Sequence, residues 1–145
     1  MPKKPKSLKP KVFFNASVIL AGLASPTGAS AYLLNQAKKG QIKAVISELV
    51  WDEVWRHRKK LGLKRGQIEN LRRFFLIVPA PAKLAKKYFS VVIDPGDTHL
   101  LVSSEELKVD FLVSLDKKHI LSLTEEISAF QIVSPAELVE RVESD

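Results

Sequence analysis

Asp110-Phe-Leu-Val-Ser-Leu-Asp116 is a short apolar run that ends on a carboxylate. The run does not alternate between polar and apolar residues. This predicts a strand buried on both faces, as in a parallel sheet covered by helices. Open α/β sheets place their functional sites just past the carboxyl ends of such strands. We therefore expect the strand to end near Ser114 and Asp116 to lie at a functional edge of the sheet.

Apolar runs of the same kind recur along the chain and alternate with helical patterns. We predict further buried strands at residues 11–15, 43–46, 76–78 and 130–133. Helical patterns cover residues 29–39, 48–60, 64–75, 82–89 and about 97–107, and a last helix starts at Ser134-Pro135. Ser47 is expected to cap the helix that follows it, and Gly62 to break it. This order predicts an α/β fold whose mainly parallel sheet is covered by helices on both faces.

Composition excludes several classes of protein. The chain has 145 residues, which suits one domain with its own core, and no cysteine, so disulfides, thiolate nucleophiles and cysteine-based zinc sites are excluded. The three histidines are too scattered for a His-rich metal motif. No apolar run approaches the ~20 residues of a membrane helix, and no secretory signal pattern follows the basic N-terminus, so we expect a cytoplasmic protein. Prolines and lysines in residues 1–10 predict a disordered basic tail before one domain at residues 11–145.

The net charge of +7 is unevenly distributed along the chain. Residues 56–87 contain eleven lysines and arginines and one acid, whereas residues 88–145 contain four basic and twelve acidic residues. A basic middle segment before an acidic C-terminal half suggests a polyanion-binding surface beside a cation site. A surface that is basic only for solubility is the alternative interpretation.

Four carboxylates and one amide follow or lie close to predicted strand ends: Asn15, Glu53, Asp94, Asp97 and Asp116. Carboxylates gathered at one edge of a sheet repel one another unless a cation joins them. Oxygen ligands suit Mg²⁺ or Mn²⁺, ions that can activate water and bind phosphoryl oxygens. Each of these residues also has a common structural use, as a helix cap, a turn residue or a solvated helix residue. The pattern alone leaves both interpretations open.

The order of these residues resembles the PIN domain family, in particular the VapC-like toxins of prokaryotic toxin–antitoxin pairs. The resemblance covers roughly residues 11–140. Four segments carry it: Val12-Phe-Phe-Asn-Ala-Ser-Val-Ile-Leu20, Ser47 with Glu53, Asp94-Pro-Gly-Asp-Thr-His99, and Val113-Ser-Leu-Asp116. The last two segments together are fairly specific, and the second is weak by itself.

The resemblance implies a three-layer α/β/α sandwich, cleavage of RNA with Mg²⁺ or Mn²⁺, and a homodimer held by an antitoxin. Glu53, Asp97 and Asp116 match the family's catalytic, metal-binding acids, and Asp94 matches a frequent accessory acid. Asn15 stands where the family has its first acid; its carbonyl oxygen can ligate a metal but carries no charge. The chain is then either a metal-dependent endoribonuclease, weakened at Asn15 or still active, or a catalytically inactive module that binds RNA or a protein.

The basic middle segment contains our predicted contacts to RNA phosphates: Arg56, Arg58, Lys64 and Arg65. Trp51 and Trp55 could stack on bases, although packing is the commoner use of a tryptophan on an apolar helix face. A Mg²⁺-dependent phosphatase on a related layout is disfavoured, because the first predicted strand lacks an Asp-x-Asp pair.

Overall fold

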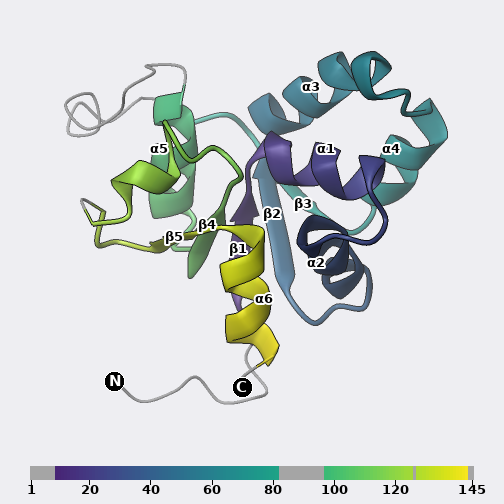
Figure 1. The fold of residues 1–145 in the computed structure, drawn as a ribbon. Coiled ribbons are helices and arrows are strands. Elements are labelled where there is room, and N and C mark those ends of the chain that lie inside the picture. Colours follow the sequence, from purple (N-terminus) through teal and green to yellow (C-terminus); the bar gives the residue numbers. More distant parts are fainter. Residues whose placement is uncertain (1–8, 82–96, 126, 144–145) are drawn as a thin grey trace.

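A single parallel sheet forms the centre of the protein (Figure 1). The computed structural model describes residues 9–81, 97–125 and 127–143. Within these residues the sheet has five strands: β1 (Lys11–Phe14), β2 (Lys43–Ser47), β3 (Leu76–Val78), β4 (Phe111–Val113) and β5 (Gln131–Val133). Their order in the sheet is β3-β2-β1-β4-β5, and every neighbouring pair is parallel. The predicted sheet is confirmed, and each strand bound agrees with the prediction to within one residue.

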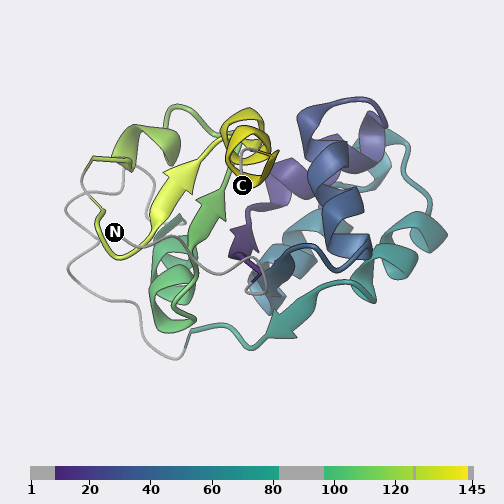
Figure 2. The ribbon, with the colours of Figure 1, turned by 90° about the horizontal axis from the view of Figure 1, so that it is seen from below.

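Helices cover both faces of this sheet. They are α1 (Ala16–Ala24), α2 (Ala29–Lys38), α3 (Glu48–His57), α4 (Arg65–Arg72), α5 (Thr98–Glu106) and α6 (Pro135–Glu143), with short 3₁₀ helices at Lys59–Leu61 and Leu121–Leu123. Figure 2 shows α1, α2 and α6 on one face and α5 on the other. Helix α2 contacts both α1 and α6, and α1 also contacts α3. The three-layer α/β/α arrangement is therefore confirmed.

Local signals in the sequence explain where α3 begins and ends. The Ser47 hydroxyl accepts a hydrogen bond from the backbone N–H of Val50 at 3.3 Å, so Ser47 caps the helix as predicted. Helix α3 ends at His57, short of the predicted residue 60, because the chain tightens there into the 3₁₀ helix Lys59–Leu61. Gly62 ends that turn with φ 67°, a left-handed conformation that favours glycine.

The pattern at residues 64–75 is helical only over α4, which ends at Arg72. Phe75 then packs its ring edge-to-face on Phe14 of β1, with 5.1 Å between ring centroids, and this contact ties the end of α4 to the sheet. The helix predicted at residues 82–89 lies outside the residues that the structure describes.

Helix α1 is absent from the sequence-based prediction, which placed the first helix at residue 29. Its nine residues, Ala-Ser-Val-Ile-Leu-Ala-Gly-Leu-Ala, are small or apolar apart from one serine. A helix that contacts other helices on more than one side needs no polar face, so its sequence lacks the 3.6-residue alternation that reveals a surface helix. The position of α1, which the sequence did not predict, bears on the candidate site because this helix starts directly after Asn15.

Among the helices described, no single one is long and apolar enough to cross a membrane. The pair α1 and α2, bent by 98° at its break, meets the length and composition criteria only when both helices are counted together.

Candidate functional site

The carboxyl ends of the parallel strands bring segments that are distant in sequence to one edge of the sheet. In the register of β1 and β4, Phe14 lies beside Val113. The next residues, Asn15 and Ser114, are therefore neighbours although 99 positions separate them. Helix α3 starts at the same edge, directly after β2 (Figure 1). The sheet thus places Asn15, the end of β4 and the start of α3 at one edge.

Asn15 is held against the end of β4. Its backbone N–H donates to the carbonyl of Val113 at 3.0 Å, and its side-chain Nδ2 donates to the hydroxyl oxygen of Ser114 at 2.9 Å. Asn15 occupies the N-cap position of α1, but its side chain makes no capping hydrogen bond. Only 7% of the residue is exposed. Asn15 therefore caps α1 only through its backbone, and its side chain is hydrogen-bonded to the neighbouring strand end.

Two serines that the sequence analysis did not single out join the β1 and β4 ends. The fully buried Ser114 hydroxyl also accepts the backbone N–H of Asp116 at 3.0 Å. The hydroxyl of Ser17, in the first turn of α1, accepts the backbone N–H of Leu115 at 3.2 Å. A serine two residues before Asp116 and another two residues after Asn15 were the available signals. Together these bonds fix the backbone that carries Asp116.

Asp116 starts a helical turn that presents its carboxylate beside an imidazole. Ile120 donates its backbone N–H to the carbonyl of Asp116 at 3.1 Å, which closes the turn. Asp116 Oδ1 accepts the backbone N–H of His119 at 2.9 Å, and Oδ2 lies 3.1 Å from His119 Nδ1. About 30% of each of these two side chains is exposed, whereas the intervening Lys117 and Lys118 are exposed to solvent.

Asp97 reaches the same place from α5. It occupies the N-cap position of that helix, as predicted, but its side chain makes no capping hydrogen bond. One ligand atom each from Asp97, Asp116 and His119 lies within 4.8 Å of the others. Ligand atoms around an octahedral ion with bonds of about 2.1 Å are separated by roughly 3 Å for neighbours and 4 Å across the ion. Two carboxylate oxygens and one imidazole nitrogen within 4.8 Å of one another are close enough for a divalent cation to join them after a small adjustment of the side chains.

The remaining predicted ligands are placed differently. Glu53 lies in the second turn of α3 and is half-buried, but it is outside the group formed by Asp97, Asp116 and His119. Asp94 lies outside the residues that the structure describes. The structure therefore brings together two of the predicted acids, Asp97 and Asp116, and adds His119, which was not predicted as a ligand. Asn15 is linked to Asp116 through Ser114, whose hydroxyl accepts hydrogen bonds from both residues.

A family model described as a PIN domain matches residues 11–118, most of the chain. The chain belongs to the PIN domain family. The match contains Asn15, Glu53, Asp97 and Asp116 and ends one residue before His119. Membership indicates a nuclease-type function, and PIN domains typically use divalent metal ions. The comparison with curated proteins gives no match.

In this PIN domain a second histidine lies close to the acids in sequence. His99 follows Asp97 by two residues, and burial lowers the pKa of His99 from its usual 6.5. Its Nδ1 is buried and has no hydrogen-bond partner. The lowered pKa favours the neutral imidazole, so His99 adds no positive charge to the start of α5 at pH 7.

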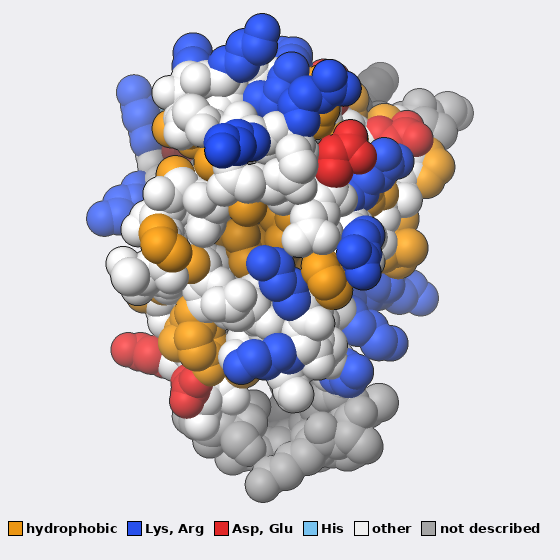
Figure 3. Space-filling view, turned by 90° about the vertical axis from the view of Figure 1, so that its right-hand side faces the viewer, with side chains coloured by type: hydrophobic (Ala, Val, Ile, Leu, Met, Phe, Trp, Pro, Cys, Tyr) orange, Lys and Arg blue, Asp and Glu red, His pale blue; other side chains and the backbone are white. Residues whose placement is uncertain are grey.

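The predicted RNA contacts lie on the face of the PIN domain that carries α3 and α4. Figure 3 shows lysine and arginine side chains gathered on its upper part. Arg56 is paired with Asp52 through a 3.0 Å contact, and Lys64 is exposed at the start of α4. The guanidinium groups of Arg58 and Arg65 lie 4.0 and 5.3 Å from the ring centroid of Trp55.

The tryptophan rings on this face lie against arginine guanidinium groups. Trp55 contacts two guanidinium groups, and the guanidinium of Arg72 lies 5.4 Å from the ring centroid of Trp51. Both rings also pack partly against the core. A base stacking on Trp55 would compete with its arginines, so the tryptophans are better suited to orient charge than to bind bases.

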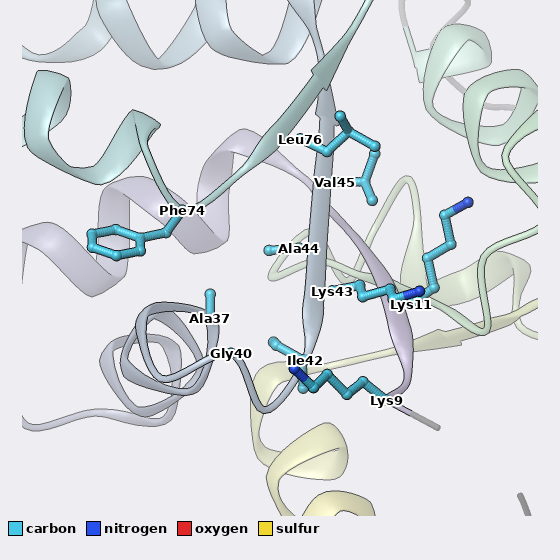
Figure 4. Close-up of a pocket in the computed structure, with 10 residues that line it drawn as sticks. All are labelled: Lys9, Lys11, Ala37, Gly40, Ile42, Lys43, Ala44, Val45, Phe74 and Leu76. Atoms are coloured by element: carbon cyan, nitrogen blue, oxygen red, sulfur yellow. The ribbon is translucent and has the colours of Figure 1, made fainter. Parts of the chain in front are cut away.

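A groove of about 500 Å³ lies at the opposite, amino edge of the sheet (Figure 4). Ile42 and Ala44 of the β2 region contribute to its apolar lining, and Lys9, Lys11 and Lys43 also line it. Lys11 directs its Nζ to the carbonyl of Leu107 at 2.8 Å. Of the predicted site residues that the structure describes, none lines the groove, which is separate from the candidate metal centre.

Proposed function

We propose that this PIN domain is an endoribonuclease that depends on Mg²⁺ or Mn²⁺ and is the toxin of a toxin–antitoxin pair. The observation that supports it best is the convergence of Asp97 and Asp116 from α5 and the β4 end. The Asp97 side chain makes no capping hydrogen bond, and although Asp116 Oδ1 caps the turn that follows it, Asp116 Oδ2 faces an imidazole. Paired acids at the carboxyl edge of a parallel sheet are suited to bind a cation.

Asp97 and Asp116 would hold the ion in this proposal. When bound, a divalent ion supplies Lewis acidity toward phosphoryl oxygens and water. Asn15 contributes a neutral oxygen donor, and its amide nitrogen is occupied by Ser114. The hydrogen bonds from Asp116 and Leu115 to the two serines keep the β4 end in place. These residues orient the acids before RNA arrives, which reduces the reorganisation needed for catalysis.

The basic face supplies the affinity for RNA in the same proposal. Arg56, Arg58, Lys64 and Arg65 lie at the end of α3 and the start of α4, while α3 begins at the sheet edge that carries the acids. A helix of ten residues spans about 15 Å. An RNA backbone following α3 would therefore connect the basic face with the candidate metal centre.

We extend the proposal to two protein partners, a second copy of the chain and an antitoxin. The family resemblance supports both. The exposed side chains of Leu49, Leu61 and Leu115 offer apolar surface for such contacts, with 42%, 47% and 43% of each residue exposed.

A specific observation favours one rival function, an inactive PIN domain that binds RNA without cutting it. Asn15 removes a negative charge from the site, and its hydrogen bond to Ser114 shows that the amide is accommodated as part of the structure. With one acid fewer, the site binds a divalent cation more weakly. The basic face would still bind RNA.

The deciding experiment is cleavage of an end-labelled single-stranded RNA in Mn²⁺, with EDTA as the metal-free control. We expect cleavage by the unmodified chain, loss of at least roughly tenfold in Asp116→Asn, and a gain in Asn15→Asp, which restores the missing charge. Glu106→Gln, an exposed acid at the far end of α5, should leave cleavage unchanged. RNA binding without cleavage in both the unmodified chain and Asn15→Asp would establish the rival function.

A further inference from the structure

The turn after β4 places a carboxylate and an imidazole at positions i and i+3. Asp116 and His119 lie on the same side of the turn, because its hydrogen bond from Ile120 to Asp116 has helical spacing. Carboxylate and histidine residues at this spacing form metal ligands on the helices of carboxylate-bridged metal proteins. The geometry of the turn is therefore one in which both side chains can bind the same ion.

The distances are those of a ligand pair. His119 Nδ1 lies 3.1 Å from Asp116 Oδ2. Neighbouring ligand atoms around an octahedral ion with bonds of about 2.1 Å are separated by roughly 3 Å. Asp97 adds a carboxylate oxygen within 4.8 Å of both. The two exposed lysines between Asp116 and His119 keep their ammonium groups in solvent.

The donor set also has a chemical preference. Mg²⁺ takes oxygen ligands and accepts imidazole poorly, whereas first-row transition ions such as Mn²⁺ accept oxygen and nitrogen together. Asn15 brings no charge, so the described group has two anionic donors and one nitrogen. Losing a carboxylate and adding an imidazole moves the site away from Mg²⁺.

We propose that His119 is a metal ligand of this chain, together with Asp97 and Asp116, and that it makes the site select Mn²⁺ over Mg²⁺. The inference rests on the proposed function in one respect, that this edge of the sheet binds the nuclease metal. The competing role for His119 is to donate a hydrogen bond to Asp116 and hold it in position. That role predicts equal effects on all divalent ions.

Spectroscopy of bound Mn²⁺ separates the two roles without measuring activity. The full chain is prepared with ¹⁴N- and ¹⁵N-labelled histidine, loaded with Mn²⁺, and examined by pulsed electron paramagnetic resonance. We expect a histidine nitrogen coupling that changes with the isotope and disappears in His119→Gln, a variant that keeps a side-chain N–H donor. His57→Ala, at the end of α3, should retain the coupling.

Calorimetric titration gives the selectivity. We expect His119→Gln to weaken Mn²⁺ binding by roughly tenfold or more and Mg²⁺ binding by less than about twofold. Mn²⁺ bound without a nitrogen coupling, or equal losses for both ions, would overturn the ligand role while leaving the proposed function standing. Absence of any Mn²⁺ binding by the folded, unmodified chain would overturn both.

Discussion

Ser114 holds two polar groups of the site through one hydroxyl oxygen, since Asn15 Nδ2 and the backbone N–H of Asp116 both donate to it. Alanine at this position leaves two donors without their acceptor, the buried Asn15 amide and the half-buried backbone N–H of Asp116. A buried donor that loses its partner costs about 1–3 kcal/mol. We expect Ser114→Ala to lower the free energy of unfolding by about 2 kcal/mol or more, measured by urea denaturation.

Ser122 provides a matched control for this substitution. Its hydroxyl donates to the carbonyl of Lys118 at 2.8 Å, but on the surface, where water can replace it. Ser122→Ala should change the unfolding free energy by no more than about 0.5 kcal/mol. Equal losses in the two variants would contradict a special role for the Ser114 hydroxyl.

At the candidate site, the sequence predicts two acids that lie close together in the structure, Asp97 and Asp116. It does not predict the neighbouring His119 and Ser114 as site residues. Asp97 and Asp116 were identifiable because each stands at a predicted strand end or helix start. His119 was not identifiable as a candidate ligand, because the chain's histidines are scattered in sequence. Only the turn after β4 brings the His119 ring next to the Asp116 carboxylate. Ser114 was also missed, because its partner Asn15 is 99 residues away and only the register of β1 and β4 brings them together.

Among the elements, the strands were predictable and α1 was not, for the same physical reason. A buried strand is marked by a continuous apolar run, and so is a helix surrounded by other elements. The run at residues 18–20 has no periodicity that distinguishes the two. In the structure α1 packs on α2 and α3, and at Gly22 its backbone approaches Leu34 and Ser30 of α2 closely.

Gly22 therefore tests the packing of α1 on α2. A Cβ at Gly22 would lie 2.6 Å from Leu34 Cδ1 and 3.0 Å from the backbone of Ser30. We expect Gly22→Ala to force the helices apart and to lower the unfolding free energy by about 1–3 kcal/mol. Gly66 lies in α4, where a Cβ meets no atom within 4 Å. Gly66→Ala should raise the unfolding free energy by about 0.5–1 kcal/mol, and a loss of stability there as large as at Gly22 would refute the packing argument.

In the whole molecule, the acidic and basic residues that are unevenly distributed along the sequence are also separated in space. The acids Asp97 and Asp116 lie at the carboxyl edge of the sheet, and arginines lie at the far end of α3. Binding of RNA to such a face releases counterions, and each phosphate contact to a single strand contributes about 0.7 to the slope of log K against log salt.

We expect Arg65→Gln to make the slope of log K against log salt shallower by about 0.7, measured in EDTA so that the RNA stays intact. Arg65→Lys keeps the charge and should keep the slope, while binding more weakly because lysine lacks the planar group that lies over Trp55. Lys39→Gln removes the same charge at the end of α2, outside α3 and α4, and should leave both slope and affinity unchanged. A slope that falls equally in Arg65→Gln and Lys39→Gln would show that RNA responds to net charge alone, and that the arginines over Trp55 do not form a defined binding face.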